Sequence, residues 1–225
     1  MSKIHPTDNK YRLPLKEKVE VENHLRPSVL TVWKRSSMSF QGTDGFTVFD
    51  RHGKLVFRVD NYSRNHRCVT ASGLVLMDGA GNALLSLKPQ MLSMQYQWNA
   101  YREEEEEGGY GKNARSKVFS MRSSSVFFNG GKDKVEVFMG AGKQGETSPD
   151  FRIEGSFRSR NCKIRTANGE MVAKIARKRV NSTIMLSDDV FTLVVQPGYS
   201  TELIMAFVVI LDRISSKAYT PILCS

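Results

Sequence analysis

Short apolar runs alternate with polar positions along most of the chain, and turn-forming residues separate them. The segment 46–59 (FTVFDRHGKLVFRV) is the clearest example, and Phe46 and Val48 share one face of its first run. An alternation with a period of two residues is typical of a strand that buries one side. The turn at 50–53 (DRHG) contains aspartate, which bonds to its own backbone, and glycine, which accepts a positive φ. The segment is therefore predicted to be a β-hairpin.

Two further segments repeat this pattern, at 74–87 with a turn at 78–81 and at 162–176 with a turn at 166–169. In both turns the fourth residue is glycine, which indicates a meander of antiparallel strands. Seven other runs have the composition of strands: 29–34, 94–101, 118–121, 135–139, 153–157, 183–186 and 191–195. About a dozen short strands in one chain predict a β-barrel or a β-sandwich.

The chain has 225 residues, a length at which a barrel or sandwich is commonly one domain. We expect an N-terminal extension at residues 1–27 and a single domain at residues 28–225. Residues 102–117 interrupt the strand pattern with the acidic run Glu103–Glu107 and a glycine-rich stretch. Like charges repel and glycine does not order the chain, so a flexible surface loop is predicted. A calcium site is the alternative, although consecutive glutamates lack the spaced turn residues of such sites.

Residues 200–215 form the second interruption, because an apolar run at 203–211 lies between two polar ends. Ser200 can cap a helix, Glu202 suits its positive start and Arg213 suits its negative end. The β-branched residues of the run would equally suit a strand, so the pattern leaves both structures open. As a helix, the segment would be apolar all round and therefore buried on every side or in lipid. Its nine apolar residues are too few to span a membrane, which takes roughly 18 or more.

The formal net charge is +10 and the sequence pI is about 9.6, which favours anionic partners. Nucleic acid, acidic lipid headgroups and acidic proteins all qualify. The charge is uneven: residues 150–180 contain nine Lys or Arg against three Asp or Glu. This one segment therefore carries six of the ten net charges.

Within the hairpin at 162–176, alternation places Ile164, Met171, Ala173 and Ile175 inward. Lys163, Arg165 and Lys174 then point outward together. Clustered cations at fixed positions bind phosphate groups through their charge and the forked geometry of arginine. The candidate headgroup-binding residues are Lys163, Arg165, Lys174, Arg177, Lys178 and Arg179, with Arg158 and Arg160 near the start of the hairpin. A solvated strand face and a nucleic-acid surface are the alternatives.

Neither a catalytic nor a metal-binding pattern is found. Cys68, Cys162 and Cys224 are odd in number and far apart, so they indicate no disulfide framework and fit a reducing compartment. The four histidines lack metal-ligand spacing, and the chain contains neither a nucleophile elbow nor a phosphate-binding glycine loop. The N-terminus lacks a signal-peptide core. We therefore expect a non-enzymatic cytoplasmic protein without metal or cofactor, either peripheral to a membrane or nuclear.

Five stretches resemble the LURP-one-related family of plants: 33–36 (WKRS), 45–62 (GFTVFDRHGKLVFRVDNY), 74–87 (LVLMDGAGNALLSL), 98–101 (WNAY) and 208–214 (VVILDRI). The family shares the tubby C-terminal-like fold with phospholipid scramblases. The resemblance implies a closed twelve-stranded antiparallel β-barrel that encloses a hydrophobic C-terminal α-helix. The departure from the family is the acidic run Glu103–Glu107, which is longer and more acidic than expected.

The resemblance also bears on function. Tubby domains bind phosphoinositide headgroups through basic residues on the barrel surface, which implies a non-catalytic binding module tethered to anionic membrane lipid. The family name implies a role in plant defence. Scramblase activity carries over weakly, because the chain lacks a proline-rich N-terminal region and an Asp-rich calcium segment. A protein-interaction scaffold or a nucleic-acid-binding regulator, with no lipid ligand, remains the rival hypothesis, and the sequence names no protein partner.

Overall fold

The structure is a computed structural model. It describes residues 26–35, 45–61, 73–90, 96–104, 114–123, 133–140, 148–179, 181 and 184–217. Its strands are β1 (Ser28–Arg35), β2 (Gly45–Phe49), β3 (Leu55–Asn61), β4 (Leu74–Asp78), β5 (Ala83–Pro89), β6 (Gln97–Glu104), β7 (Ala114–Ser123), β8 (Asp133–Met139), β9 (Phe151–Ser156), β10 (Asn161–Thr166), β11 (Met171–Arg177) and β12 (Val190–Val195). The helix α2 (Thr201–Lys217) follows β12.

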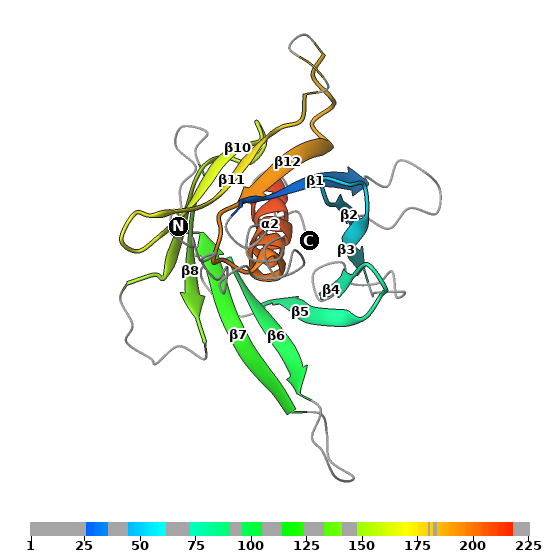
Figure 1. Ribbon diagram of the computed structural model, residues 1–225. Coiled ribbons are helices and arrows are strands. Elements are labelled where there is room, and N and C mark those ends of the chain that lie inside the picture. Colours follow the sequence, from blue (N-terminus) through cyan, green and yellow to red (C-terminus); the bar gives the residue numbers. More distant parts are fainter. Residues whose placement is uncertain are drawn as a thin grey trace, which may run out of the picture.

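The strands form one closed antiparallel barrel in which each strand pairs with its neighbours in the sequence (Figure 1). The barrel closes where β1 pairs with β12, in a register that runs from Ser28 opposite Val195 to Trp33 opposite Val190. Closure gives every strand a hydrogen-bonded neighbour on both sides, so the barrel has no edge strand. The prediction of a closed twelve-stranded antiparallel barrel is confirmed.

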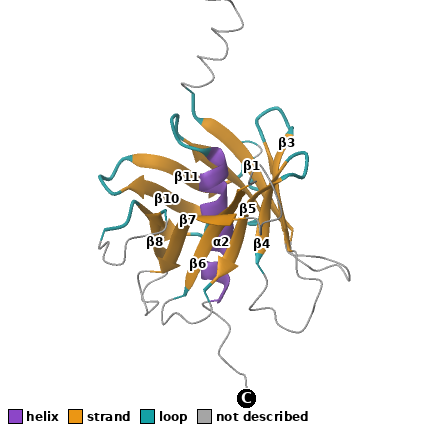
Figure 2. Ribbon diagram, turned by 90° about the horizontal axis from the view of Figure 1, so that it is seen from below, coloured by secondary structure: helices purple, strands orange, loops and turns teal. Residues whose placement is uncertain are grey.

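Helix α2 lies inside the barrel and runs along its length (Figures 1 and 2). Residues 204–211 are at most 1% exposed, so the run is buried on every side, as a helix without a polar face must be. The Ser200 hydroxyl accepts a hydrogen bond from the Leu203 amide at 3.2 Å, and Glu202 lies in the first turn. These capping interactions are the predicted ones, and the helical alternative is confirmed.

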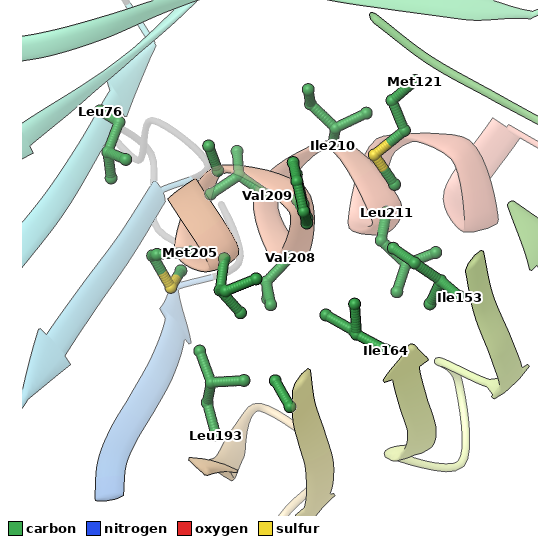
Figure 3. Close-up of a cluster of buried hydrophobic side chains, with 14 of the residues drawn as sticks. Leu76, Met121, Ile153, Ile164, Leu193, Met205, Val208, Val209, Ile210 and Leu211 are labelled. Atoms are coloured by element: carbon green, nitrogen blue, oxygen red, sulfur yellow. The ribbon is translucent and has the colours of Figure 1, made fainter. Parts of the chain in front are cut away.

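Side chains from the barrel wall and from α2 together form the core. The ring of Phe207 packs edge-on against Phe119 at 4.8 Å between centroids and also contacts Phe151 at 5.6 Å. Figure 3 shows Val208, Ile210 and their neighbours among wall residues that come from strands on several sides. The helix therefore takes the place of the second sheet that a β-sandwich would use to bury its inner face.

The three predicted hairpins are confirmed as β2–β3, β4–β5 and β10–β11. Their turn glycines Gly53, Gly81 and Gly169 have φ values of 78°, 101° and 84°, as such turns require. These turns lie at the end of the barrel where α2 begins. The connection between β11 and β12 lies at the opposite end, beside the C-terminal part of α2.

Two sequence predictions need correction. Residues 184–186 do not form a strand, and only an isolated bridge joins Met185 to Arg179. The loop expected at 102–117 is shorter, because β6 continues to Glu104 and β7 begins at Ala114, with Glu103 opposite Arg115. Pairing with a neighbouring strand outweighs the local effect of charge and glycine at these positions. The remainder of that predicted loop, residues 105–113, lies outside the described residues, as do most of the N-terminal extension, Cys68 and Cys224.

Candidate functional site: a cationic outer face

The outer wall of β10 and β11 carries the basic residues that the sequence singled out. Ile164, Ala173 and Ile175 point into the core and are fully buried. The inward position predicted for Met171 is wrong: the register shifts between Ile164 and Arg165, and Met171 is half-buried opposite Arg165. Lys163 and Lys174 are exposed, and Arg165 is half-buried. The predicted separation into an apolar inner row and a cationic outer row is therefore present.

The strand register brings these cations into like-charged pairs. Lys163 lies directly opposite Lys174 across β10 and β11, and Arg165 lies directly opposite Arg152 across β10 and β9. Like charges at directly opposite positions destabilise a sheet, by up to roughly 1 kcal/mol for a pair. Neither Lys163 nor Lys174 forms a salt bridge among the described residues. Lys163 also lies opposite Glu154 on β9, and Arg152 lies opposite Glu136 on β8. The four cations of the two pairs outnumber these two carboxylates and form a site suited to an external anion.

The charge continues onto the strands that precede this hairpin. Arg122 on β7, Lys134 on β8 and Arg152 on β9 also lie on the outer wall. We define the cationic face as six outward cations on β7–β11: Arg122, Lys134, Arg152, Lys163, Arg165 and Lys174. Arg115 and Lys117 also face outward on β7 but lie beside β6 and are not included. Two outward carboxylates, Glu136 and Glu154, lie among the six cations, which leaves a net charge of four. Glu136 pairs with Arg122 at 3.5 Å.

The arginines on this face are held by local contacts that orient them. The Arg165 guanidinium donates to the Gly169 carbonyl at 2.8 Å, and Arg152 donates to the Ala167 carbonyl at 3.5 Å, so both reach the β10–β11 turn. The Arg122 guanidinium lies 4.4 Å above the ring of Phe138, an outward-facing residue that it covers. Fixed guanidinium groups lose less rotamer entropy when they bind an anion.

The predicted residues at the far end of β11 form a separate group with different environments. Arg177 pairs with Asp188 at 2.8 Å. The Lys178 ammonium reaches across the wall and donates to the Thr31 hydroxyl at 3.2 Å. Arg179 is exposed and lies opposite Met185. The candidate residues therefore divide into the cationic face and a second group at the base of the β11–β12 connection.

Arg160 was considered with the basic hairpin but is only 6% exposed. Its guanidinium lies between the rings of Phe157 and Phe191, at 4.3 and 4.5 Å from their centroids, and donates to the Asp188 carbonyl at 2.6 Å. Burial lowers the pKa of this group, while the nearby charges of Asp212, Asp188 and Asp189 oppose that shift. Arg160 therefore closes the end of the barrel and is not available to a headgroup.

A groove of about 820 Å³ lies over β4–β6 near the start of α2, with walls that include Val75, Leu84 and Tyr101. Its two arginines are already paired within the protein. Arg102 contacts Glu202 at 2.8 Å, and Arg115 contacts Glu103 at 2.9 Å. The groove thus lacks the excess positive charge that distinguishes the cationic face.

Metal and membrane-spanning features were sought in the same residues. The described part of the chain contains no group of three or more His, Cys, Asp or Glu that could hold a metal ion. Across those residues, no helix has both the length and the apolar character needed to cross a bilayer. Cys162 is a buried free thiol, and His52 is exposed in the β2–β3 turn.

Fold and site together define a helix-filled antiparallel β-barrel whose excess positive charge is concentrated on one part of its outer wall. A sequence model of the LURP-one-related family matches residues 28–212. The chain belongs to the LURP-one-related family. It is 38% identical over 187 residues to LURP-one-related protein 5 of Arabidopsis thaliana, with 82% of each chain covered. It is also 36% identical to LURP-one-related protein 12 of the same plant, over 83% of this chain and 77% of that one.

A solved structure has a similar fold. An X-ray structure of a protein from Arabidopsis thaliana superimposes with a TM-score of 0.55 at 20% sequence identity. The match covers 84% of this chain and 92% of the other. At this identity the likeness concerns the fold alone.

Proposed function

We propose that this protein is a non-catalytic binding module that attaches to anionic membrane lipid through its cationic face. The observation that carries the proposal is the pair of directly opposed, exposed ammonium groups of Lys163 and Lys174. A folded protein gains nothing in stability from such a pair. A phosphate-bearing surface above both strands would neutralise the repulsion, and the neighbouring arginines Arg152 and Arg165 offer forked hydrogen bonding to phosphate oxygens.

Phosphoinositides are the lipid class that this geometry favours. Their headgroups carry several phosphates on one ring, and the four cations of β9–β11 lie in two adjacent rows. Tubby-like barrels, whose fold the family shares, bind this class. The proposed setting is the cytoplasmic surface of a membrane in a plant cell, with a link to plant defence that family membership supports.

The test is sedimentation of the full chain with vesicles of defined composition. Wild-type protein should bind phosphatidylcholine vesicles that contain phosphatidylinositol bisphosphate and should not bind phosphatidylcholine alone. Each cation near the membrane surface contributes about 1 kcal/mol to the free energy of binding. Lys163→Glu/Lys174→Glu should therefore weaken binding by roughly thirtyfold or more. The matched control is Lys54→Glu/Lys88→Glu, which makes the same charge change at exposed lysines outside the cationic face.

Equal loss of binding in both double variants would show that net charge alone drives the attachment and would contradict a defined site. The rival nucleic-acid function has a different signature. Binding to any DNA duplex would weaken steeply and log-linearly with salt concentration. A protein that binds DNA in this way but ignores anionic vesicles would overturn the lipid proposal.

A further inference from the structure

Four large apolar side chains are exposed on the described surface: Val29, Trp33, Ile184 and Met185, with exposed fractions of 40%, 50%, 53% and 44%. Three of them lie at the end of the barrel where β12 begins. Trp33 is opposite Val190, the first residue of β12, and Ile184 and Met185 belong to the connection that precedes this strand. Exposed apolar residues that gather in one place mark a contact surface.

We define the β11–β12 arm as the described residues 178, 179, 181 and 184–189. Figure 1 shows it extending away from the barrel wall beside β12. Its base is fastened to the barrel at several points. Asp188 accepts from Arg177 through its carboxylate and from Arg160 through its carbonyl, and the Asp189 carbonyl accepts from the Lys34 amide at 2.8 Å. An arm with a fixed base presents its apolar residues with little ordering cost on binding.

Two cations lie beside the exposed Met185 of the arm. Arg179 is opposite Met185, and the Arg177 guanidinium lies 3.3 Å from the Met185 sulfur. Around Trp33 the adjoining outer wall is uncharged at the outward positions Val190, Thr192, Thr31 and Thr47, and Arg35 ends β1 beyond them. Exposed apolar residues beside long cationic side chains suit a bilayer surface, because the cations can reach anionic headgroups while the apolar residues enter the interfacial region.

The arm adjoins the cationic face through β11. Lys174 is in the middle of β11 and Arg177 is at its end, so a surface resting on the cationic face can also meet the arm. An anionic bilayer offers both negative charge and an apolar layer on one surface. Tryptophan is also enriched at the membrane–water interface, because its ring is apolar and its indole N–H is polar.

We propose that the β11–β12 arm is an apolar membrane anchor. Ile184 and Met185 enter the interfacial region of an anionic phospholipid bilayer, Trp33 lies at the interface, and Arg177 to Arg179 contact the headgroups. This inference rests on the proposed function, because the cationic face brings the arm to the bilayer. The anchor adds an apolar contribution to membrane binding. This contribution requires a bilayer and plays no part when the cationic face binds a soluble anion.

The experiment compares two ligands for the full chain. Ile184→Ser/Met185→Ser should weaken partitioning onto vesicles of phosphatidylcholine and phosphatidylserine by about tenfold or more, because apolar area no longer leaves water. The same variant should bind soluble inositol hexakisphosphate as the wild-type protein does. The matched control is Val29→Ser, which removes an exposed apolar side chain near the opposite end of β1 and should leave vesicle binding unchanged.

Fluorescence locates the interface directly. Vesicles of phosphatidylserine and phosphatidylcholine with brominated acyl chains should quench Trp33, and Trp33→Phe should remove the quenched signal, since Trp98 is only 4% exposed in the core. If the double serine variant binds vesicles like the wild-type protein and Trp33 is not quenched, the anchor is wrong while the cationic face still stands. A wild-type protein that binds no anionic vesicle overturns both proposals. Unchanged vesicle binding together with loss of a protein contact at Ile184 would assign the arm to a protein partner instead.

Discussion

The Lys34 ammonium lies 2.8 Å from the Asp212 carboxylate, which joins β1 to helix α2 across 178 residues of sequence. The side chain of Asp212 is only 6% exposed and that of Lys34 is 22% exposed, so the pair is largely shielded from water. It connects the strand that closes the barrel to the helix that fills it. The contact fixes the axial position of α2 within the barrel.

Removal of one partner of this pair should be costly. Lys34→Met would leave a buried carboxylate without its salt-bridge partner, and we expect a loss of about 3 kcal/mol in the free energy of unfolding. Lys34→Met/Asp212→Leu should recover most of that loss, because no unpaired charge remains. Urea unfolding of both variants measures the difference. A double variant as unstable as the single one would mean that the pair itself, and not the avoidance of an unpaired charge, stabilises the barrel.

The buried position of Phe207 makes the helix sensitive to a single charge. Phe207→Ala should cost roughly 3–5 kcal/mol through the cavity that it leaves between Phe119 and Phe151. Phe207→Asp should prevent soluble folding altogether, because the carboxylate would be buried without a partner. Thr201→Asp is the control, since it adds the same charge at the half-buried start of the same helix, where a negative charge is favourable. Expression and thermal melting of the three variants test the position of α2, and an unchanged melting curve for Phe207→Asp would contradict it.

A pH dependence is expected from the β4–β5 turn. The Asn82 side chain and the backbone amides of Gly81 and Asn82 donate to the Asp78 carboxylate, and these hydrogen bonds lower its pKa. A lowered folded-state pKa gives stability that is present above the unfolded value of about 3.9 and is lost as the pH falls through the folded value. Asp78→Asn should therefore be less stable than the wild-type protein at neutral pH. The difference should shrink below about pH 4, and thermal melting across that range would contradict the argument if the gap stayed constant.

The hairpins and the ends of α2 could be predicted because their determinants are local. A turn glycine, an alternating run or the capping Ser200 lies within a few residues of the element that it specifies. The segment 183–186 has strand composition. Among the described residues, however, it forms a single β-bridge, between Met185 and Arg179. Strand formation there depends on a partner that the local sequence does not reveal.

The residues of the candidate site also differ in how far the local sequence determines their positions. Alternation alone placed Lys163, Arg165 and Lys174 on the outer wall. It did not place Arg152 opposite Arg165, because that pairing depends on the register between β9 and β10. The burial of Arg160 could not be predicted for a related reason. Its guanidinium lies against Phe191, which is about thirty positions away in the sequence, as well as against Phe157. A meander does suggest which strands are neighbours, so alternation on β7–β9 was the signal for Arg122, Lys134 and Arg152.

The Lys163–Lys174 pair predicts a conflict between stability and binding. The two ammonium groups occupy directly opposite positions on β10 and β11. A double-mutant cycle with Lys163→Gln and Lys174→Gln isolates their interaction, and we expect a repulsive coupling of roughly 0.2–1 kcal/mol. Lys174→Gln should thus be slightly more stable than the wild-type protein, whereas Lys163→Gln also loses its favourable neighbour Glu154 on β9. Both variants should bind anionic vesicles less well.

The salt dependence of the coupling free energy tests whether the interaction between Lys163 and Lys174 is electrostatic. Both lysines are exposed, so the repulsion should fall as ionic strength rises, because charges in solvent are screened over about 10 Å at 0.1 M and about 3 Å at 1 M. Urea unfolding of the four proteins at both salt concentrations gives the coupling directly. Lys54→Gln, at an exposed position in the β2–β3 turn, is the control and should change stability little. If the coupling is zero at low salt, the lysines are independent solvated side chains, and the cationic face loses the feature that distinguishes it from ordinary barrel surface.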